Sequence, residues 1–386
     1  MKFVYGTKNT SKIAHMKHIL KDMHIEIEGL DENVDEPVED GKDTLSNARI
    51  KAMHYYKQVK RPVFSADSGL YFEDVEDCDQ PGKFIRRVDG KSLTDEEMID
   101  HYSKLSRKYG GKLKAYYHNS ICLVLDEDHI IEYDGSDLNS EVFYIVEKPH
   151  KTRKPGFPLD ALSVEISSGS YYDDLTDYIF DNSTLDKGFQ DFFKRVLRPE
   201  VTIGFKDFGK VKVELYPYYA PDCVRNFIEL IEKDYYKDKS IVRVVPGRLI
   251  QSGDDHLHPE NWTDDTPGYI LNGEFNRPGF KNPLDFKRGT LGMAMAADHK
   301  TDYSTAGSFF IMTRDEPSLN EIVPAFGRVT DGMAIVDKMN QVKTHTDYGY
   351  DAPVETIQIE SIVVDKKGVV YDSPKKIGFD QLRPTD

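Results

Sequence analysis

The hydrophobic pattern of this chain changes near Arg198-Pro199-Glu200, and this change constrains the fold more than any other feature. Before it, short apolar runs alternate with segments whose apolar residues recur every three or four positions, as in strands that alternate with helices. After it, apolar and polar residues alternate along short runs that end at glycines, as in an antiparallel sheet. A chain of 386 residues can hold one core in each half. We therefore predict domains at residues 1–197 and 198–366 and a tail at 367–386.

The charge composition limits the classes of partner. The chain has 67 acidic and 51 basic side chains, a net charge of −16. Proteins that coat nucleic acid need a basic face to displace counterions, so we expect no nucleic-acid partner. No run of about 18 apolar residues is present, and the chain opens on a short strand at residues 2–6, so we predict a cytoplasmic protein with no membrane partner. Cys78, Cys122 and Cys223 are odd in number and far apart, which argues against a disulfide framework or a cysteine zinc site.

Short motifs follow one another through the second half. They include Phe208-Gly209-Lys210-Val211, Arg243-Val244-Val245-Pro246-Gly247, Ile250-Gln251-Ser252-Gly253, Arg288-Gly289-Thr290-Leu291-Gly292, Ser308-Phe309-Phe310-Ile311-Met312 and Phe326-Gly327-Arg328-Val329. In this order they resemble the blocks of the cyclophilin-type peptidyl-prolyl cis-trans isomerases, over about residues 201–365. The resemblance implies an eight-stranded antiparallel β-barrel with two helices.

The resemblance also implies a site for rotation about a prolyl amide bond. The barrier is about 18–20 kcal/mol because resonance gives the C–N bond double-bond character. A guanidinium that donates to the prolyl nitrogen weakens that resonance while an apolar pocket holds the ring. Arg243 matches the catalytic arginine of the family and Gln251 the glutamine beside it. The matching peptide-binding positions are Leu249, Phe310, Leu319, Met295 and Ser308. We expect proline-containing peptides or proteins as partners and no cofactor for this domain.

Several positions around this site differ from the usual family residues. These positions are Val242, Arg248, Met295, Ser308, Ser318 and Val323. Because productive geometry depends on the groups that hold the peptide, they predict weak or altered isomerase activity, or a peptide-binding module. Arg248 at the pocket mouth, if it is mobile, indicates acidic residues beside the proline.

Segments of the first half carry groups suited to phosphate chemistry. Residues 7–12 lie between a strand and a helix, where backbone N–H groups bind anions. Further motifs are Glu39-Asp40-Gly41, Asn47-Ala48, Lys51-Ala52, Ser65-Ala66-Asp67-Ser68-Gly69-Leu70, Pro81-Gly82 with Arg87, and Gly156-Phe157 with Asp160. Together they resemble the inosine triphosphate pyrophosphatase family, which cuts non-standard purine nucleoside triphosphates between the α and β phosphates. The resemblance implies an α/β domain with a mixed sheet.

Hydrolysis of a polyanion by an acidic protein requires a cation. Glu39 and Asp67 match the magnesium-binding acids of the family, so we expect Mg²⁺ as the cofactor of this domain. Asp67, expected at the carboxyl end of a strand, could also activate the attacking water. The implied nucleotide-binding residues are Thr7, Asn9, Lys12, Ser68, Gly69, Arg87 and Asp160. The family also implies a homodimer through this domain. The alternative is that Glu39 is part of a solvated acidic run over residues 31–43.

Other positions depart from this family. Ala66 and Ser46 replace acids, Pro158-Leu159 replaces a glycine-aromatic step, and no serine-histidine-arginine segment lies near residues 185–187. The purine selectivity of the domain is therefore open.

We predict a fusion of a nucleoside triphosphate pyrophosphatase-like hydrolase with a peptidyl-prolyl isomerase. The alternative is a non-catalytic scaffold or chaperone that binds nucleotide and peptide without turnover. A further reading makes His256 and His258 metal ligands. The tail could add a strand or dock as a helix onto either domain.

Overall fold

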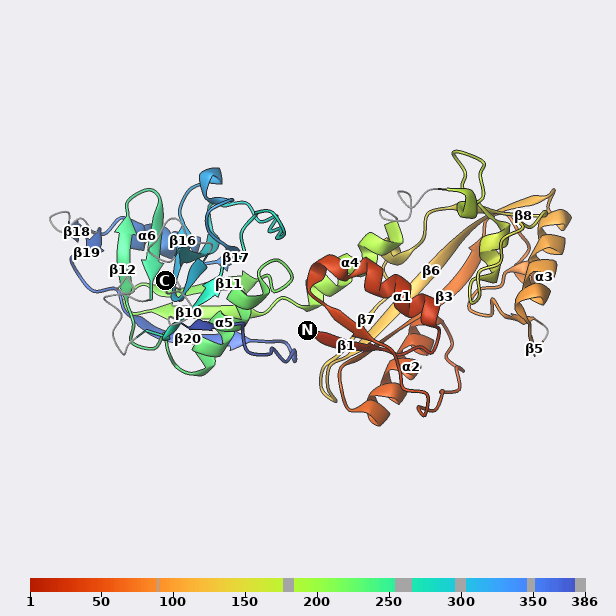
Figure 1. The fold of residues 1–386 in the computed structure, drawn as a ribbon, viewed down its shortest axis with the longest axis horizontal. Coiled ribbons are helices and arrows are strands. Elements are labelled where there is room, and N and C mark those ends of the chain that lie inside the picture. Colours follow the sequence, from red (N-terminus) through yellow and green to blue (C-terminus); the bar gives the residue numbers. More distant parts are fainter. Residues whose placement is uncertain (89, 176–183, 254–265, 296–302, 346–350, 379–386) are drawn as a thin grey trace, which may run out of the picture. The chain divides into compact units, whose positions relative to one another are not determined.

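The chain forms two compact units, Met1–Val196 and Leu197–Asp386 (Figure 1). The computed structural model describes residues 1–88, 90–175, 184–253, 266–295, 303–345 and 351–378. Within these ranges, one large hydrophobic cluster lies in the first unit, around Leu70 and Tyr102, and another lies in the second, around Phe227 and Phe309. None of the helices in these ranges is long and apolar enough to cross a bilayer.

The first unit is built on a mixed seven-stranded sheet in the order β2-β1-β3-β6-β8-β9, with β7 paired to β6. β1 is parallel to β2 and β3, and the remaining pairs are antiparallel. The strands are β1 (Lys2–Tyr5), β2 (Glu26–Glu28), β3 (Val63–Phe72), β6 (Lys112–Val124), β7 (Ile130–Tyr133), β8 (Phe143–Val146) and β9 (Ser163–Val164), and a separate hairpin joins β4 (Arg87–Val88) to β5 (Lys91–Ser92).

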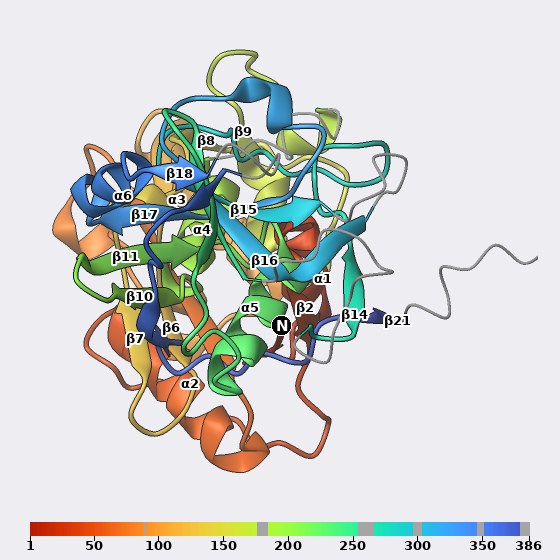
Figure 2. The ribbon, with the colours of Figure 1, turned by 90° about the vertical axis from the view of Figure 1, so that its left-hand side faces the viewer.

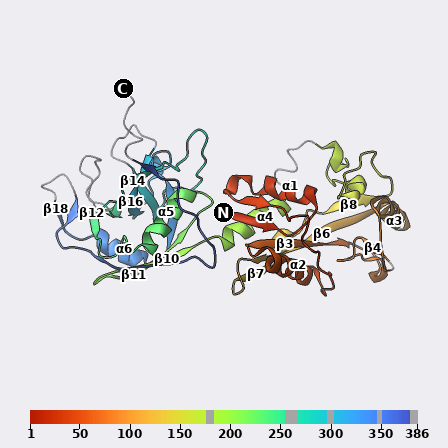
Figure 3. The same ribbon diagram turned by 60° about the horizontal axis from the view of Figure 1, so that its bottom comes forward.

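The helices of this unit are α1 (Thr10–Ile19), α2 (Thr44–Val59), α3 (Asp95–Lys108) and α4 (Thr184–Val196). α1 and α4 lie over one face of the sheet and α2 over the other (Figure 3). Because successive side chains of a strand point to opposite faces, each strand contributes residues to the contacts with both layers of helices. Phe64 packs edge-on against Phe193 of α4, whereas Cys122, on the opposite face, packs with Ala48 and Ala52 of α2.

β3 is longer than the sequence indicated. The sequence placed Asp67 at the carboxyl end of a strand, but β3 pairs with β6 as far as Phe72 and Ala115, so Asp67 lies in its middle. Successive side chains of a strand point to opposite faces of the sheet. Leu70 and Phe72 are therefore buried in the core around α3, while Asp67 lies on the opposite face.

The second unit contains a ten-stranded antiparallel sheet whose main path runs β12-β13-β16-β15-β17-β11-β10-β20. Its strands are β10 (Glu200–Phe205), β11 (Gly209–Leu215), β12 (Ile241–Val245), β13 (Leu249–Ser252), β14 (Tyr269–Asn272), β15 (Thr290–Met295), β16 (Tyr303–Met312), β17 (Ala325–Asp331), β20 (Ile359–Asp365) and β21 (Ile377–Gly378), and β18 (Thr344–His345) pairs with β19 (Ala352–Pro353).

The eight strands of the main path curve into an open half-barrel, where the sequence predicted an eight-stranded antiparallel β-barrel. Along the described strands no ladder joins β12 to β20, but a bridge between Ser240 and Gln358 connects the two ends, together with backbone hydrogen bonds such as that from the Ile241 N–H to the Ile357 carbonyl oxygen at 2.9 Å. Helices α5 (Pro221–Glu232) and α6 (Met333–Asn340) pack against the main core. The two helices that the sequence predicted are therefore present.

The C-terminal segment adds a strand to the second unit. β21 pairs with β14 (Figure 2), and Lys376 Nζ lies 2.6 Å from Glu229 Oε1 on α5. Of the two arrangements considered for the tail, strand addition is the one found. Residues 379–386 lie outside the described residues.

Candidate active sites

In the first unit, the acids Glu39 and Asp67 converge on the ammonium group of Lys51. Lys51 Nζ lies 2.6 Å from Asp67 Oδ1 and 3.5 Å from Glu39 Oε2. Asn47 Nδ2 donates to Asp67 Oδ2 at 3.1 Å, and Asn47 Oδ1 accepts from the Gly41 N–H at 2.9 Å. Asn47 and Lys51 are four residues apart on α2 and therefore share a helix face. The two acids are thus held by a lysine and an amide from one helix.

The turn before α1 brings a second ammonium group to the acids. Asn9 caps α1, since its Oδ1 accepts from two N–H groups of the first turn, and its own N–H donates to Thr7 Oγ1 at 3.2 Å. Burial lowers the pKa of Lys12, and the neighbouring charge of Lys51 lowers it further. Two ammonium groups therefore accompany the two carboxylates, and the turn adds the N-terminus of a helix.

The segment with Asp160 packs against the same turn. Gly156 adopts φ +85°, and a Cβ at this position would come 2.8 Å from Asn9 Nδ2. Asp160 lies on the short helix η4 (Pro158–Leu162), and burial raises its pKa to about 6 although Lys154 Nζ is 3.6 Å away. Residues far apart in the sequence thus meet at the start of α1.

The remaining predicted nucleotide-binding residues lie less close to the acids. Ser68 projects to the opposite face of β3, where its Oγ donates to Asn119 Oδ1 at 2.6 Å. Gly69 lies on the face that carries the acids, close to the ring of Tyr71. Arg87 is exposed on β4. Its neighbour Arg86 is the arginine whose charge contributes to the lowered pKa of Lys12.

Three residues of this site were not assigned a role from the sequence: Asn47, Lys51 and Lys83. Asn47 and Lys51 stand at helical spacing next to the acidic motif, which was a usable signal. Lys83 Nζ donates to the Gly41 carbonyl oxygen across the mouth of the site. No pattern predicted this contact, because it joins two loops 42 residues apart.

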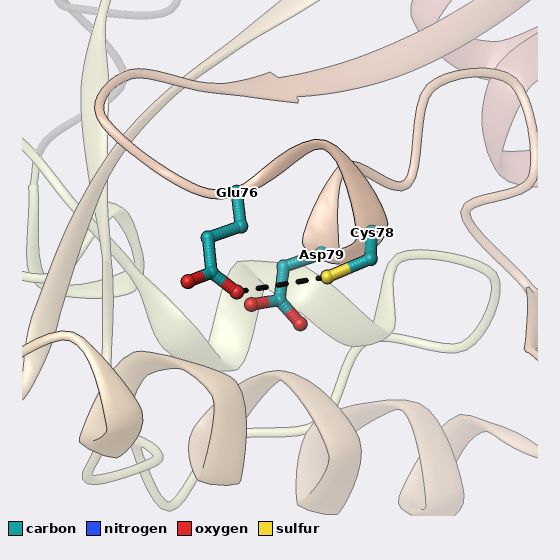
Figure 4. A group of neighbouring side chains, drawn as sticks. All are labelled: Glu76, Cys78 and Asp79. Atoms are coloured by element: carbon teal, nitrogen blue, oxygen red, sulfur yellow. Dashed lines mark hydrogen bonds between the residues drawn. The ribbon is translucent and has the colours of Figure 1, made fainter.

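A separate group of residues, of the types that bind metal ions, lies on the surface of this unit (Figure 4). Ligand atoms of Glu76, Cys78 and Asp79 fall within 4.8 Å of one another, and Cys78 Sγ lies 3.7 Å from Glu76 Oε2. Lys108 Nζ, however, lies 2.5 Å from Asp79 Oδ2 and 3.6 Å from Glu76 Oε2, and the Tyr109 hydroxyl also donates to Asp79. The group already has its counter-ion, and we assign it no metal.

In the second unit, sheet register places the predicted catalytic residues in one row. Arg243 on β12 is opposite Gln251 on β13, which is opposite Phe310 on β16, which is opposite Gly292 on β15. Gln251 is buried, while the Arg243 side chain is 37% exposed, with its Nε 4.0 Å from Asp351 Oδ2. The row therefore leads from an accessible guanidinium to an apolar floor.

That floor is a hydrophobic cluster distinct from the main core. The cluster, which we call the pocket cluster, consists of Leu249, Phe286, Phe310, Met312, Val323 and Ala325, with Val245, Leu284, Met295 and Leu319 packed against it. Four of the five predicted peptide-binding residues belong to it. The fifth, Ser308, is buried two residues before Phe310 on β16 but does not belong to the cluster. Phe286 was missed, because it lies in a loop without periodicity.

Gly292 leaves space for two aromatic rings of this cluster. A Cβ at Gly292 would lie 2.2 Å from the Phe310 ring and 2.8 Å from the Phe286 ring. The two rings stack with centroids 5.6 Å apart. Only glycine therefore allows β15 to pass beneath them.

An ionic network occupies the rim of the pocket cluster. Arg248 Nε lies 3.3 Å from Glu316 Oε2, and Arg314 Nη2 donates to the same oxygen at 2.7 Å. Hydrogen bonds from Arg314 and then Ser318 lower the pKa of Glu316 to about 2. Arg248 therefore has an ion-pair partner in Glu316. His256 and His258, the alternative metal ligands, lie outside the described residues.

Comparison with known proteins identifies the second unit. Residues 200–364 match the family model described as cyclophilin type peptidyl-prolyl cis-trans isomerase/CLD. Peptidyl-prolyl cis-trans isomerase B of Bacillus subtilis is 34% identical over 136 residues, which are 35% of this chain and 86% of that protein. The chain belongs to the cyclophilin family. We call residues 197–386 the cyclophilin unit.

Other cyclophilins are similar over the same part of the chain. Peptidyl-prolyl cis-trans isomerase-like 2 of Gibberella zeae is 31% identical over 157 residues, which are 40% of this chain, and this chain spans a quarter of its length. A cyclophilin structure from Cryptosporidium parvum, determined in the presence of the dipeptide Ala-Pro, aligns with 26% identity and a TM-score of 0.37, covering 43% of this chain and 98% of that chain.

The first unit matches a different family. Residues 3–154 match the Ham1 family model, in agreement with the resemblance drawn from the sequence. The chain therefore joins a Ham1-like unit, residues 1–196, to the cyclophilin unit. Asp160 lies just beyond the matched range.

Proposed function

We propose that the cyclophilin unit catalyses cis-trans isomerisation of peptidyl-prolyl bonds. The observation that carries the proposal is the row Arg243, Gln251 and Phe310, which leads from a half-exposed guanidinium to the pocket cluster. Such a row holds a proline ring in the cluster while the guanidinium reaches its amide. Its partners are proline-containing peptides or proteins.

The reaction requires no group beyond this row. The guanidinium of Arg243 donates to the prolyl nitrogen as that nitrogen becomes pyramidal, which removes the resonance that opposes rotation. Gln251, buried at the next position of the row, fixes the peptide beside the guanidinium. The pocket cluster binds the ring in both isomers, so the acceleration comes from the hydrogen bond made only in the twisted state.

The test is isomerisation of a proline tetrapeptide by the full chain. Arg243→Ala is expected to lower kcat/KM by about 100-fold, the usual loss when one transition-state donor is removed. Arg243→Lys is also expected to be slow, because an ammonium does not reproduce the planar fork. Lys210→Ala, on the exposed start of β11, is the matched control. Equal rates for wild type and Arg243→Ala would refute the proposal.

We also propose that the Ham1-like unit is a metal-dependent nucleoside triphosphate pyrophosphohydrolase with the fold of the inosine triphosphate pyrophosphatase family. The observation that supports it is the convergence of Glu39 and Asp67 with the lysines Lys12 and Lys51. Carboxylates and ammonium groups side by side suit a triphosphate that carries a divalent cation.

Different residues of this site bind the phosphate groups and the divalent cation. Lys12 and Lys51 bind phosphate oxygens, and the start of α1, whose Ser11 and Lys12 N–H groups are capped by Asn9, contributes the positive end of its dipole. Glu39 and Asp67 offer the hard oxygen ligands that Mg²⁺ prefers, and the ion supplies charge compensation for the phosphates. Asn47 orients Asp67, which accepts the proton of the attacking water. The surrounding nucleotide site includes Thr7, Asn9, Gly69 and Asp160. A nucleotide-binding role for Ser68 and Arg87 is supported only by the family resemblance.

A nucleotide panel with and without Mg²⁺ tests this second function. Release of pyrophosphate from at least one triphosphate is expected only with the metal, and Asp67→Asn is expected to abolish it. Asp79→Asn, in the surface group of the same unit, is the control. Metal-independent release, or an active Asp67→Asn variant, would refute the proposal.

The wider properties of the chain follow from these two functions. We propose a cytoplasmic enzyme that dimerises through the Ham1-like unit, which sedimentation can test. The non-catalytic scaffold is not favoured, because Arg243, Glu39 and Asp67 are all retained. Calorimetry that detects binding of peptide and nucleotide without any turnover would support the scaffold instead.

A further inference from the structure

Lys51 fills the space that a metal ion would need between Glu39 and Asp67. Its side chain is 12% exposed, and that of Asp67 is 13% exposed. Lys51 Nζ lies 2.6 Å from Asp67 Oδ1, while Asn47 donates to the other carboxylate oxygen. Both oxygens of Asp67 are therefore engaged, and Glu39 Oε2 faces the same ammonium at 3.5 Å.

The two acids already have basic partners without a metal. Glu39 and Asp67 both face the ammonium group of Lys51, and Lys12 lies close enough to interact with both acids. Mg²⁺ binds carboxylate oxygens at about 2.0–2.1 Å, and an ion that bridges Glu39 Oε2 and Asp67 Oδ1 would have to stand where Lys51 Nζ contacts both oxygens. A bare cation would have to displace Lys51 and then face two uncompensated ammonium groups.

A triphosphate changes these pairings. Its oxygens offer both lysines new partners, and its negative charge compensates the incoming cation. Once Lys51 turns to a phosphate oxygen, the carboxylates are released as ligands. The structure thus contains a cation that must move before a second cation can bind.

We propose that Lys51 excludes free divalent cations from the Ham1-like unit and admits them only together with a nucleoside triphosphate. This inference rests on the proposed pyrophosphohydrolase function and concerns how that site is loaded. Because coupling between two ligands is reciprocal, the nucleotide tightens metal binding by the factor by which the metal tightens nucleotide binding.

Mn²⁺ binding to the full chain tests the proposal without any turnover; it is followed by the paramagnetic resonance signal of the free ion, after subtraction of the Mn²⁺ that the nucleotide analogue binds without protein. Wild type alone is expected to bind Mn²⁺ weakly, and about tenfold or more tightly once a non-hydrolysable α,β-methylene purine triphosphate is added. Lys51→Met is expected to bind Mn²⁺ without nucleotide about tenfold more tightly than wild type and to lose most of this coupling. Lys57→Met, exposed on the same helix, is the matched control and should behave as wild type.

The outcomes separate the inference from the function on which it rests. If wild type alone binds Mn²⁺ as tightly as with the analogue, the inference is wrong, while pyrophosphate release would still support the function. If Mn²⁺ does not bind in the presence of the analogue, both are wrong. The wild-type comparison requires no variant, and Lys51→Gln replaces Lys51→Met if circular dichroism shows that the latter is misfolded.

Discussion

Glu274 shows how much one buried carboxylate contributes to the cyclophilin unit. It is 3% exposed, and its two oxygens accept from the N–H groups of Asp222 and Cys223 at 2.9 and 2.8 Å, at the start of α5. Burial raises its pKa to about 7, and the charge of Asp222 adds to the shift. A side chain from the loop after β14 therefore caps a helix from outside.

This capping carboxylate predicts a pH-dependent stability. Because the pKa is higher in the folded than in the unfolded state, the folded state binds more protons between about pH 4.5 and 7. Its contribution is full below about pH 4.5 and is lost as the pH rises through about 7. Glu274→Gln cannot ionise, so the free energy of unfolding of wild type relative to this variant should fall by about 3 kcal/mol from about pH 4 to 8. Denaturant unfolding curves measure this difference, and parallel pH profiles would contradict it.

The rim network makes a second prediction about single residues. Glu316→Ala removes the partner of Arg248 and leaves two guanidinium groups at the pocket mouth. We expect this variant to prefer a glutamate over a lysine beside the proline by about threefold to fivefold more than wild type does, as for an exposed ion pair. Competition between the two peptides measures this preference. It should shrink at 1 M salt, where charges are screened within about 3 Å, and a preference insensitive to salt would contradict the explanation.

At the level of elements, the C-terminal segment can be removed to test what it stabilises. Ending the chain at residue 374 removes the pairing of β21 with β14, the bond from the Lys375 N–H to Asp222 Oδ1, and the contact of Lys376 with Glu229. We expect a loss of about 1 kcal/mol, which lowers the melting temperature of the cyclophilin unit by about 2–4 °C. Ending the chain at residue 378, which keeps β21, is the control. Equal melting of both truncated chains would show that the segment stabilises nothing.

Elements were predictable where one face of the chain had to be buried. Apolar residues recur at helical spacing over residues 44–59, and Thr94 with Glu97 forms a capping box at the start of α3, so both helices can be predicted from the sequence. β3 was predicted too short, because Asp67 and Gly69 interrupt the apolar run on the face that does not pack on α3. β21 could not be predicted, since a two-residue strand depends entirely on its partner β14.

The two sites differed in how much the sequence could reveal. Arg243 and Phe310 could be assigned from the sequence because each stands in an ordered motif, on β12 and β16, and Leu249 directly precedes the motif of β13. Phe286 was not found, because its place in the pocket cluster depends on a loop that returns beneath Gly292. Likewise, no pattern indicates that Lys51 binds the two acids, since helix spacing gives only the face on which it lies.

At the level of the whole molecule, each unit has its own core and its own site, so we expect each to respond to its own ligand. A calorimetric scan of the full chain should show one transition that shifts upward with an α,β-methylene triphosphate and Mn²⁺, and another that shifts with a proline peptide. At a ligand concentration of 100 Kd each shift corresponds to about 2.7 kcal/mol. A single transition that moves with either ligand would contradict separate stability.

The connection between the units has a consequence for how the chain can be cut. α4 ends at Val196 and β10 begins at Glu200, and in the short link Leu197 and Pro199 are buried. The Pro199 carbonyl oxygen already accepts from the Leu215 N–H at 2.9 Å. Proteases need several exposed, mobile residues, and this link offers none. Limited digestion should therefore not cut the chain within residues 197–199, and the masses of the fragments check this expectation.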